Sequence, residues 1–249
     1  MPFLKINGRL IHYNISGEGE CLILLHDGFY NTTSWNNVRE ELSKHFIVID
    51  YDRFGYGKSD HYTEKFNGDL IYLYVEELKT LVDELKLGKF HICGHCLGGA
   101  IALCYAADNP SKINKIIAES VGYFSDHMLL MKSDMTFRPF SQIDSKLKND
   151  LVTMNGEEYA EEFWNYIYDY KKTYIMAEDY SILDKIKKID SKVLVINGDR
   201  DFYFDVEHAI IGFRKFKNAN LWIVPDAGHA PHITRSTDFV KNTLKFLLK

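Results

Sequence analysis

The stretch that decides the fold is Phe90-His91-Ile92-Cys93-Gly94-His95-Cys96-Leu97-Gly98-Gly99-Ala100. A short apolar run turns there through glycines into an alanine-rich segment, which predicts a strand, a sharp turn and a helix from Leu97 to about Ala107. Such a turn presents one side chain at its tip, with glycines two residues before and after it because no larger side chain fits. Here that side chain is Cys96, and the amides of the following helix favour a thiolate or a developing oxyanion beside it. The alternative is a glycine-rich turn with a buried, inert cysteine.

The rest of the chain alternates strand patterns with helical patterns around this stretch. With 249 residues, 46% of them hydrophobic, it can form one substantial core. Asn7-Gly8 predicts a hairpin over residues 2–18, and a surface helix is expected over 69–87 with Gly88 as its stop. Short apolar runs predict the strands of a mainly parallel, doubly wound sheet, in an α/β fold. These runs are 21–25, 46–50, 115–119, 192–197 and 221–225, and a last helix covers 236–248.

The alternation stops between residues 121 and 184. This segment is helical in pattern and rich in aromatic residues and methionine, and we interpret it as a cap inserted into a core domain of residues 1–120 and 185–249. Its aromatic side chains can pack on one another or line a cleft beneath the cap. The side chains that we expect to contact a substrate are Phe29, Tyr123, Phe124 and Trp164.

Two later strand patterns end in residues that suit catalysis. Residues 192–197 lead into Gly198-Asp199-Arg200-Asp201, and residues 221–225 lead into Gly228-His229. Because the carboxyl ends of parallel strands share one edge of the sheet, an acid and a histidine are expected beside Cys96. A histidine there takes the thiol proton and returns it to a leaving group, and an acid orients the ring. His229 is the expected base, with His232 as the alternative.

The order nucleophile, acid, histidine resembles that of the α/β-hydrolase superfamily, and the resemblance covers nearly the whole chain. It implies an α/β-hydrolase fold, a mostly parallel doubly wound sheet flanked by helices, with an inserted helical cap. Four motifs carry it: Leu25-His26-Asp27-Gly28 with Trp35, then Asp52-Arg53-Phe54-Gly55-Tyr56-Gly57-Lys58-Ser59-Asp60, then Gly94-His95-Cys96-Leu97-Gly98, and Gly228-His229.

The resemblance also implies roles for single residues. Relatives usually carry the acid three residues after the glycine that ends its strand, which selects Asp201, with Asp199 as the alternative. The oxyanion hole would use the amides of Leu97 and Gly28. Asp27 departs from the family, which usually has glycine there, so Gly28 and Phe29 both stay open as the second donor.

Two further groups of residues are expected to organise loops rather than to react. These are His26 and the pair Asp52-Arg53.

Cys96 stands where most relatives carry serine. Similar cysteine elbows occur in dienelactone hydrolases and in polyhydroxyalkanoate synthases, whereas the rest of the chain resembles the capped, esterase-like branch of the superfamily. The implied activity is hydrolysis of an ester, thioester or lactone of a small apolar acyl group, through a Cys96–His229–Asp201 triad and a covalent acyl-enzyme. An acyltransferase with the same triad and a ligand receptor with this fold are the alternatives.

Composition limits the partners. The net charge is −5 and there is no basic cluster, so we expect a small-molecule substrate and no nucleic acid. There is no signal segment and no run long enough to span a membrane, which favours a cytoplasmic protein. The four cysteines fall in core patterns, which disfavours disulfides, and the Cys93–Cys96 spacing is not expected to hold a metal. No cofactor is expected, and the sequence does not indicate an oligomeric state.

Overall fold

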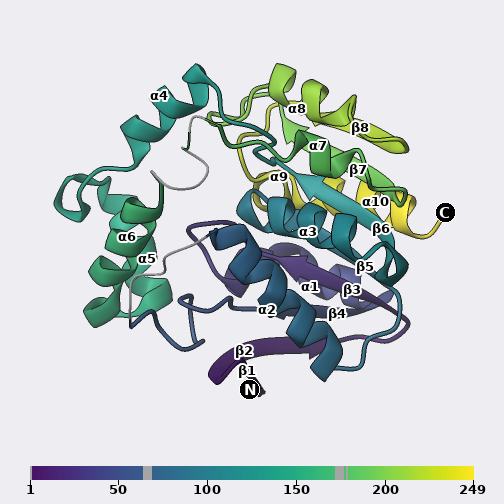
Figure 1. Ribbon diagram of the computed structural model, residues 1–249, viewed down its shortest axis with the longest axis horizontal. Coiled ribbons are helices and arrows are strands. Elements are labelled where there is room, and N and C mark those ends of the chain that lie inside the picture. Colours follow the sequence, from purple (N-terminus) through teal and green to yellow (C-terminus); the bar gives the residue numbers. More distant parts are fainter. Residues whose placement is uncertain (1, 64–68, 172–176, 178) are drawn as a thin grey trace.

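The structure is a computed structural model that describes residues 2–63, 69–171, 177 and 179–249. In these residues eight strands form one sheet with the order β1-β2-β4-β3-β5-β6-β7-β8 (Figure 1). Neighbouring strands from β4 to β8 pair in parallel, and β2 pairs antiparallel with both β1 and β4. The expected mostly parallel sheet with an antiparallel start is therefore confirmed. The strands are β1 (Phe3–Ile6), β2 (Arg9–Ser16), β3 (Glu20–Leu25), β4 (Phe46–Tyr51), β5 (Phe90–His95), β6 (Ile113–Glu119), β7 (Lys192–Gly198) and β8 (Ala219–Val224).

The first two strands form the expected hairpin. Asn7 and Gly8 join them with φ angles of 51° and 86°, and Ile6 pairs with Arg9. Positive φ at both central residues matches the right-handed twist of the paired strands, and asparagine followed by glycine tolerates it best.

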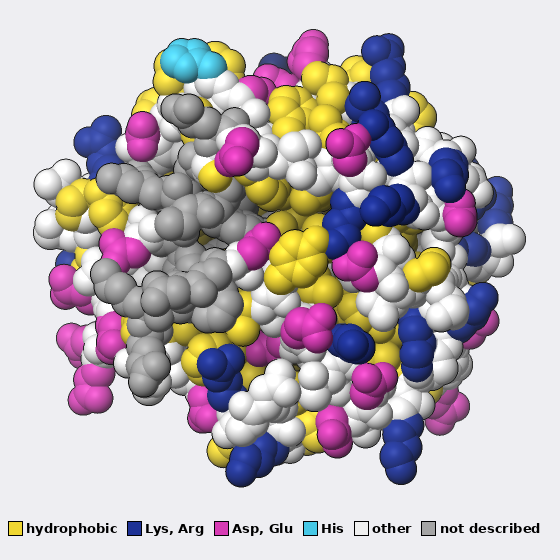
Figure 2. Space-filling view, viewed as in Figure 1, with side chains coloured by type: hydrophobic (Ala, Val, Ile, Leu, Met, Phe, Trp, Pro, Cys, Tyr) yellow, Lys and Arg dark blue, Asp and Glu magenta, His cyan; other side chains and the backbone are white. Residues whose placement is uncertain are grey.

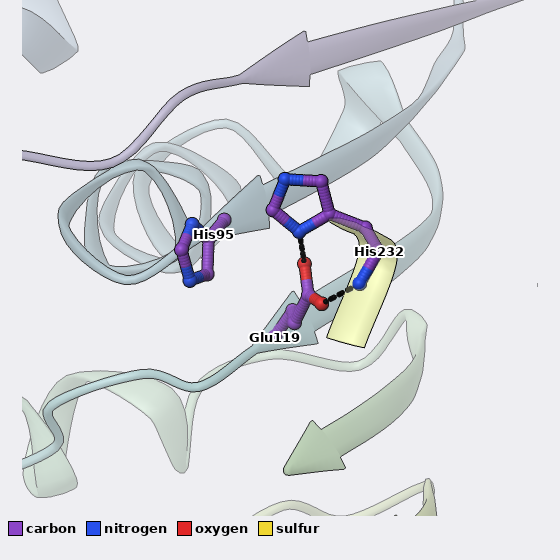
Figure 3. Close-up of side chains that lie close together, drawn as sticks. All are labelled: His95, Glu119 and His232. Atoms are coloured by element: carbon purple, nitrogen blue, oxygen red, sulfur yellow. Dashed lines mark hydrogen bonds and ion pairs between the residues drawn. The ribbon is translucent and has the colours of Figure 1, made fainter. Parts of the chain in front are cut away.

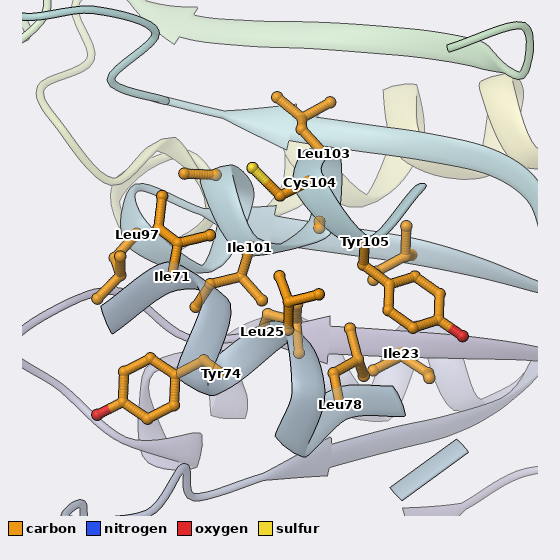
Figure 4. Close-up of a cluster of buried hydrophobic side chains, with 14 of the residues drawn as sticks. Ile23, Leu25, Ile71, Tyr74, Leu78, Leu97, Ile101, Leu103, Cys104 and Tyr105 are labelled. Carbon is orange, nitrogen blue, oxygen red and sulfur yellow. The ribbon is translucent and has the colours of Figure 1, made fainter. Parts of the chain in front are cut away.

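Helices cover both faces of the sheet because the central strands are apolar on both sides. Along β3, Leu22 and Leu24 belong to one buried cluster, whereas Ile23 and Leu25 belong to the other. Figure 4 shows the cluster that contains Ile23 and Leu25, which meet side chains of α2 (Leu70–Glu84) and α3 (Leu97–Asp108). The cluster that contains Leu22 and Leu24, on the other face of the sheet, packs against α1 (Asn36–Ser43) and α10 (Ser236–Leu247).

Helix α2 ends earlier than the sequence predicts. It stops at Glu84, and Lys86 rather than Gly88 takes the left-handed conformation, with φ of 51°. The Leu87 amide then donates to the Val82 carbonyl at 3.0 Å, which closes the last turn. This bond satisfies a terminal carbonyl and offsets the cost of positive φ at a lysine, so Gly88 is not needed as the stop.

Helices α4 (His127–Thr136), α5 (Ser145–Asn155) and α6 (Glu157–Lys171) lie between β6 and β7 in the chain and to one side of the sheet (Figure 1). The two ends of this insertion meet, because the Ser125 amide donates to Tyr180 O and the Ile182 amide to Tyr123 O, both at 2.9 Å. Of the expected cap range, residues 172–176 and 178 lie outside the described part of the chain. The remaining helices are α7 (Leu183–Ile186), α8 (Val206–Phe213), α9 (Pro231–Thr234) and the 3-10 turns η1 (Thr32–Trp35), η2 (Pro110–Lys112) and η3 (Phe140–Gln142).

The surface carries charges of both signs. On the face in Figure 2, lysine and arginine side chains are interspersed with aspartate and glutamate. No helix among the described residues is long and apolar enough to cross a bilayer.

Candidate active site

The turn after β5 has the geometry of a nucleophile elbow. Cys96 sits between β5 and α3 with φ of 51° and ψ of −114°, a conformation that is costly for a residue with a side chain. The surrounding glycines are required by close backbone contacts. A Cβ on Gly94 would lie 2.3 Å from the Gly98 carbonyl oxygen, and one on Gly98 would lie 2.3 Å from the Leu25 carbonyl oxygen. Helix α3 can approach the ends of β5 and β3 this closely only because these positions lack side chains.

The loops after β7 and β8 bring an acid and a histidine together. Nδ1 of His229 lies 3.0 Å from each carboxylate oxygen of Asp201. Since a carboxylate only accepts, Nδ1 carries the proton and Nε2 is left as the basic nitrogen. The Asp201 carboxylate is in turn held by the amides of Tyr203 at 2.9 Å and Phe204 at 3.2 Å. This leaves the acid buried and fixed on the far side of the imidazole.

Asp199 and His232, the alternative acid and base from the sequence, have other partners in the structure. The Asp199 carboxylate accepts the Ala227 amide at 3.3 Å, whereas His229 is bonded to Asp201. His232 is fully buried, and its Nδ1 lies 2.8 Å from Oε2 of Glu119. Asp199 therefore holds a turn, and His232 pairs with another acid behind the site.

The charges in this group support one another. Burial acts against a charged imidazole, but Asp201 and Cys96 outweigh it and raise the pKa of His229 well above its ordinary value. Burial alone would raise the pKa of Asp201, yet His229 and the amides of Phe204 and Tyr203 lower it below its ordinary value. A raised pKa makes the His229 imidazole a stronger base next to Cys96.

The amides expected to form an oxyanion hole come from two elements. Leu97 is the first residue of α3, and Gly28 follows β3, where an added Cβ would lie 3.7 Å from Leu97 Cδ2. The Phe29 amide donates to Oδ1 of Asp27 at 2.7 Å, so it is already occupied. Of the two donors left open by the sequence, Phe29 is bonded to a side chain and Gly28 lies beside Leu97.

A cavity of about 650 Å³ opens next to this group. Its wall includes side chains from the loop after β3, the elbow, the loops after β7 and β8, and helix α5. Among them are Asp27, Phe29, Tyr30, His95, Tyr203 and His229. A cavity of this size can hold a small organic substrate next to the histidine.

The four residues expected to bind the substrate lie in different places, and they do not all face the cavity. Phe29 lines the cavity and packs against Trp164, with ring centroids 5.8 Å apart. Trp164 itself is fully buried and donates from Nε1 to the Arg138 carbonyl at 2.7 Å. Tyr123 is 1% exposed and Phe124 is half-buried, and both stack on His208. Phe29 is thus the member of the set in that cavity wall.

The fold and this geometry agree with what comparisons with known proteins find. The profile of the alpha/beta hydrolase fold family matches residues 22–236. The chain belongs to the α/β-hydrolase family. It is similar to a 2-hydroxy-6-oxo-6-phenylhexa-2,4-dienoate hydrolase of Comamonas testosteroni, at 24% identity over 98% of this chain and 95% of that protein. The human serine hydrolase BPHL is 25% identical over 98% of this chain and 85% of its own length.

A solved structure extends the likeness in fold. The enol-lactonase from Burkholderia xenovorans LB400 superposes with a TM-score of 0.76 at 21% identity, and the match covers 100% of both chains. The family match and the two hydrolases described before it identify this chain as an enzyme of the α/β-hydrolase type.

One buried cluster of this α/β-hydrolase brings together side chains that could bind a metal ion. Among the described residues, ligand atoms of His95, Glu119 and His232 lie within 4.8 Å of one another (Figure 3). Glu119 is already engaged, since its Oε1 accepts the His232 amide and its Oε2 contacts His232 Nδ1, both at 2.8 Å. Both of these contacts of the buried carboxylate are with His232.

His26, Asp52 and Arg53, which the sequence predicts to organise loops, hold the segment after β3. Nδ1 of His26 donates to the Asp27 carbonyl at 2.9 Å, and its Nε2 accepts the Arg53 amide at 3.2 Å. The Arg53 guanidinium donates to the carbonyls of His26 and Asp27, while Asp52 accepts the amides of Thr32 and Lys58. These bonds are to backbone, and Asp52 also pairs with the His12 side chain at 3.0 Å, as expected of residues that organise loops.

Sequence reasoning missed three residues next to Cys96, His229 and Asp201. Tyr203 packs edge-on against His229 at 5.0 Å, and its hydroxyl lies 3.0 Å from that of Thr136 in α4. His95 and Asp27 lie between the elbow and the loop after β3. Only Asp27 left a signal in the sequence, as a departure from the glycine usual in the family, because the other two act through contacts between distant segments.

Proposed function

We propose that Cys96, His229 and Asp201 form a catalytic triad that hydrolyses an ester, thioester or lactone of a small apolar acyl group. One observation carries the proposal. A cysteine stands at positive φ on a nucleophile elbow beside a histidine whose Nδ1 is 3.0 Å from both oxygens of a buried aspartate. Such an arrangement activates a nucleophile and fixes the tautomer of its base.

In the proposed reaction the Cys96 proton moves to Nε2 of His229, and Sγ attacks the carbonyl carbon of the substrate. The amides of Leu97 and Gly28 stabilise the negative oxygen of the tetrahedral intermediate. His229 then gives its proton to the leaving oxygen or sulfur, and a thioester with Cys96 remains. Water, deprotonated by His229, attacks this thioester and releases the acid and the Cys96 thiol.

The relatives favour hydrolysis over acyl transfer. One is named as hydrolysing a dienoate, and a structural neighbour is named as an enol-lactonase. Water is the second substrate of such reactions. The cysteine is this chain's own feature, similar to the elbow of dienelactone hydrolases, and we propose that it replaces the usual serine as the nucleophile.

We further propose that residues 121–184 act as a cap that presents apolar walls to the acyl group. Phe29 supports this, because it packs against both Phe137 and Trp164, with ring centroids 5.4 and 5.8 Å apart. In this proposal Trp164 supports Phe29 from behind, whereas Tyr123 and Phe124, which stack on His208, are candidates for contact with a more distant part of the acyl group. Each methylene buried on such a wall contributes about 0.8 kcal/mol.

A series of p-nitrophenyl esters tests the proposed substrate class. With Cys96→Ala as the blank, kcat/KM should rise by about one to two orders of magnitude over two or three added carbons before the pocket is full. A preference for dicarboxylic half-esters would contradict an apolar acyl group. Turnover that depends on added amine or thiol acceptors would favour the acyltransferase instead.

A further inference from the structure

A chain of contacts joins the three loops around the triad, and its centre is His95. This residue precedes Cys96 and is 1% exposed. Its Nε2 donates to the His229 carbonyl at 2.8 Å, and its Nδ1 faces Oδ2 of Asp27 at 3.4 Å. One imidazole therefore lies between the backbone of the base and the loop after β3.

Asp27 carries the chain of contacts onward into the oxyanion loop. Its Oδ1 accepts the amides of Phe29 and Tyr30, each at 2.7 Å. Burial acts against ionisation of this carboxyl, but His95 and the two amides lower its pKa below the ordinary value. A charged acceptor with two short amide bonds fixes the turn that aims the neighbouring Gly28 amide.

We propose that Asp27 and His95 are positioning residues that hold the oxyanion amide of Gly28 and the backbone of His229 in register with Cys96. The inference rests on the proposed function, since it assigns what these residues position. It also explains the departure at position 27. The family's usual glycine leaves this loop free of a side-chain anchor, whereas Asp27 supplies one that reaches His95.

The geometry separates a positioning role from a direct one. Asparagine at position 27 keeps a carbonyl oxygen for the Phe29 and Tyr30 amides, and its amide nitrogen stays next to Nδ1 of His95. Alanine keeps neither contact. A residue that acts only through these bonds is therefore rescued by asparagine, whereas a carboxylate that touches the substrate as a base is not.

The test compares Asp27→Ala, Asp27→Asn, His95→Ala and the double variant Asp27→Ala with His95→Ala. Asp27→Ala should lower kcat on a p-nitrophenyl ester by about 10- to 100-fold with little change in KM, because misplaced groups weaken transition-state contacts. Asp27→Asn should recover most of that loss. The double variant should lose no more than the worse single variant, as expected of one network.

Hydrogen exchange at the Phe29 and Tyr30 amides supplies a readout that does not need turnover. Exchange should be faster in Asp27→Ala and close to the parent rate in Asp27→Asn. The positioning role would be overturned if Asp27→Asn had parent-like exchange but were as inactive as Asp27→Ala. An unchanged kcat in Asp27→Ala would also overturn it. If Asp27→Ala does not fold, Asp27→Asn and His95→Gln are compared by the same measures, and loss of kcat in both overturns it. A parent protein without turnover would refute the proposed function alone, because the exchange rates still test the network.

Discussion

At the scale of single residues, Cys96 differs from the other three cysteines in its surroundings. All four are free, but Cys93 and Cys104 are buried, and Cys96 is partly exposed beside His229. Burial raises the pKa of Cys21 to about 11 and that of Cys104 to about 12, and burial with Glu119 raises that of Cys93 well above its ordinary value.

Iodoacetamide should therefore alkylate Cys96 well before the other cysteines at neutral pH, because the thiolate is the reacting form. Peptide mapping after short exposures measures the order. Labelling of Cys21 or Cys104 at the same rate would show that Cys96 is not activated by its neighbours.

The two acids after β7 make a matched pair at the same scale. Asp201→Asn removes the charge that orients His229 and should lower turnover by roughly three to four orders of magnitude. Asp199→Asn changes only an acceptor for the Ala227 amide and should cost far less. The kcat values of the two purified variants decide the assignment, and the reverse ranking would refute it.

At the scale of elements, the close approach of α3 to β3 depends on Gly98. A Cβ there would meet the carbonyl oxygens of Leu25 and His26 at 2.3 and 2.4 Å, which the backbone cannot relieve without moving the elbow. Gly98→Ala should lower Tm by several degrees and abolish turnover.

Gly88→Ala is the control for this substitution. No atom lies within 4 Å of its added Cβ, so Tm and kcat should stay near the parent values. A Gly98→Ala protein with parent-like Tm and kcat would show that the elbow can shift more freely than the contacts indicate.

Helix α2 carries a buried acid that links stability to pH. Burial raises the pKa of Glu77 from 4.5 to about 8, although the Phe54 amide and Arg53 act in the opposite direction. In the unfolded chain this carboxyl loses its proton near pH 4.5, whereas the folded protein keeps it to about pH 8. Rising pH across this window therefore favours the unfolded state, and the loss is complete above it.

Glu77→Gln removes that loss. At pH 4 the Tm of the variant and of the parent sets the reference difference. At pH 8.5 the Tm of the variant should exceed that of the parent by a few degrees more than this reference, since one pKa unit corresponds to about 1.4 kcal/mol. Thermal melts at both pH values measure the change. A Tm difference that is the same at both would contradict a raised pKa at Glu77.

At the scale of the whole molecule, the sequence predicted what local geometry dictates. The Asn7-Gly8 hairpin follows from positive φ, and the strands of a mainly parallel sheet follow from apolar runs, and both are confirmed. The sequence could not choose between Asp199 and Asp201 from residue type, because both follow β7, and their loop geometry decides which carboxylate faces His229. The contact of His95 with Asp27 joins distant segments of the chain. Such contacts produce no periodic pattern in the sequence and so could not be predicted from it.

The central claim is that Cys96 carries the acyl group, and intact mass spectrometry of the quenched enzyme tests it most directly. After rapid mixing with p-nitrophenyl butyrate, the account predicts an intact mass increase of one butyryl group, which digestion then locates on the peptide that contains Cys96. The adduct should be removed by hydroxylamine, as a thioester is, and should be absent in Cys96→Ala. Turnover that persists in Cys96→Ala, or an adduct on another residue, would contradict the account.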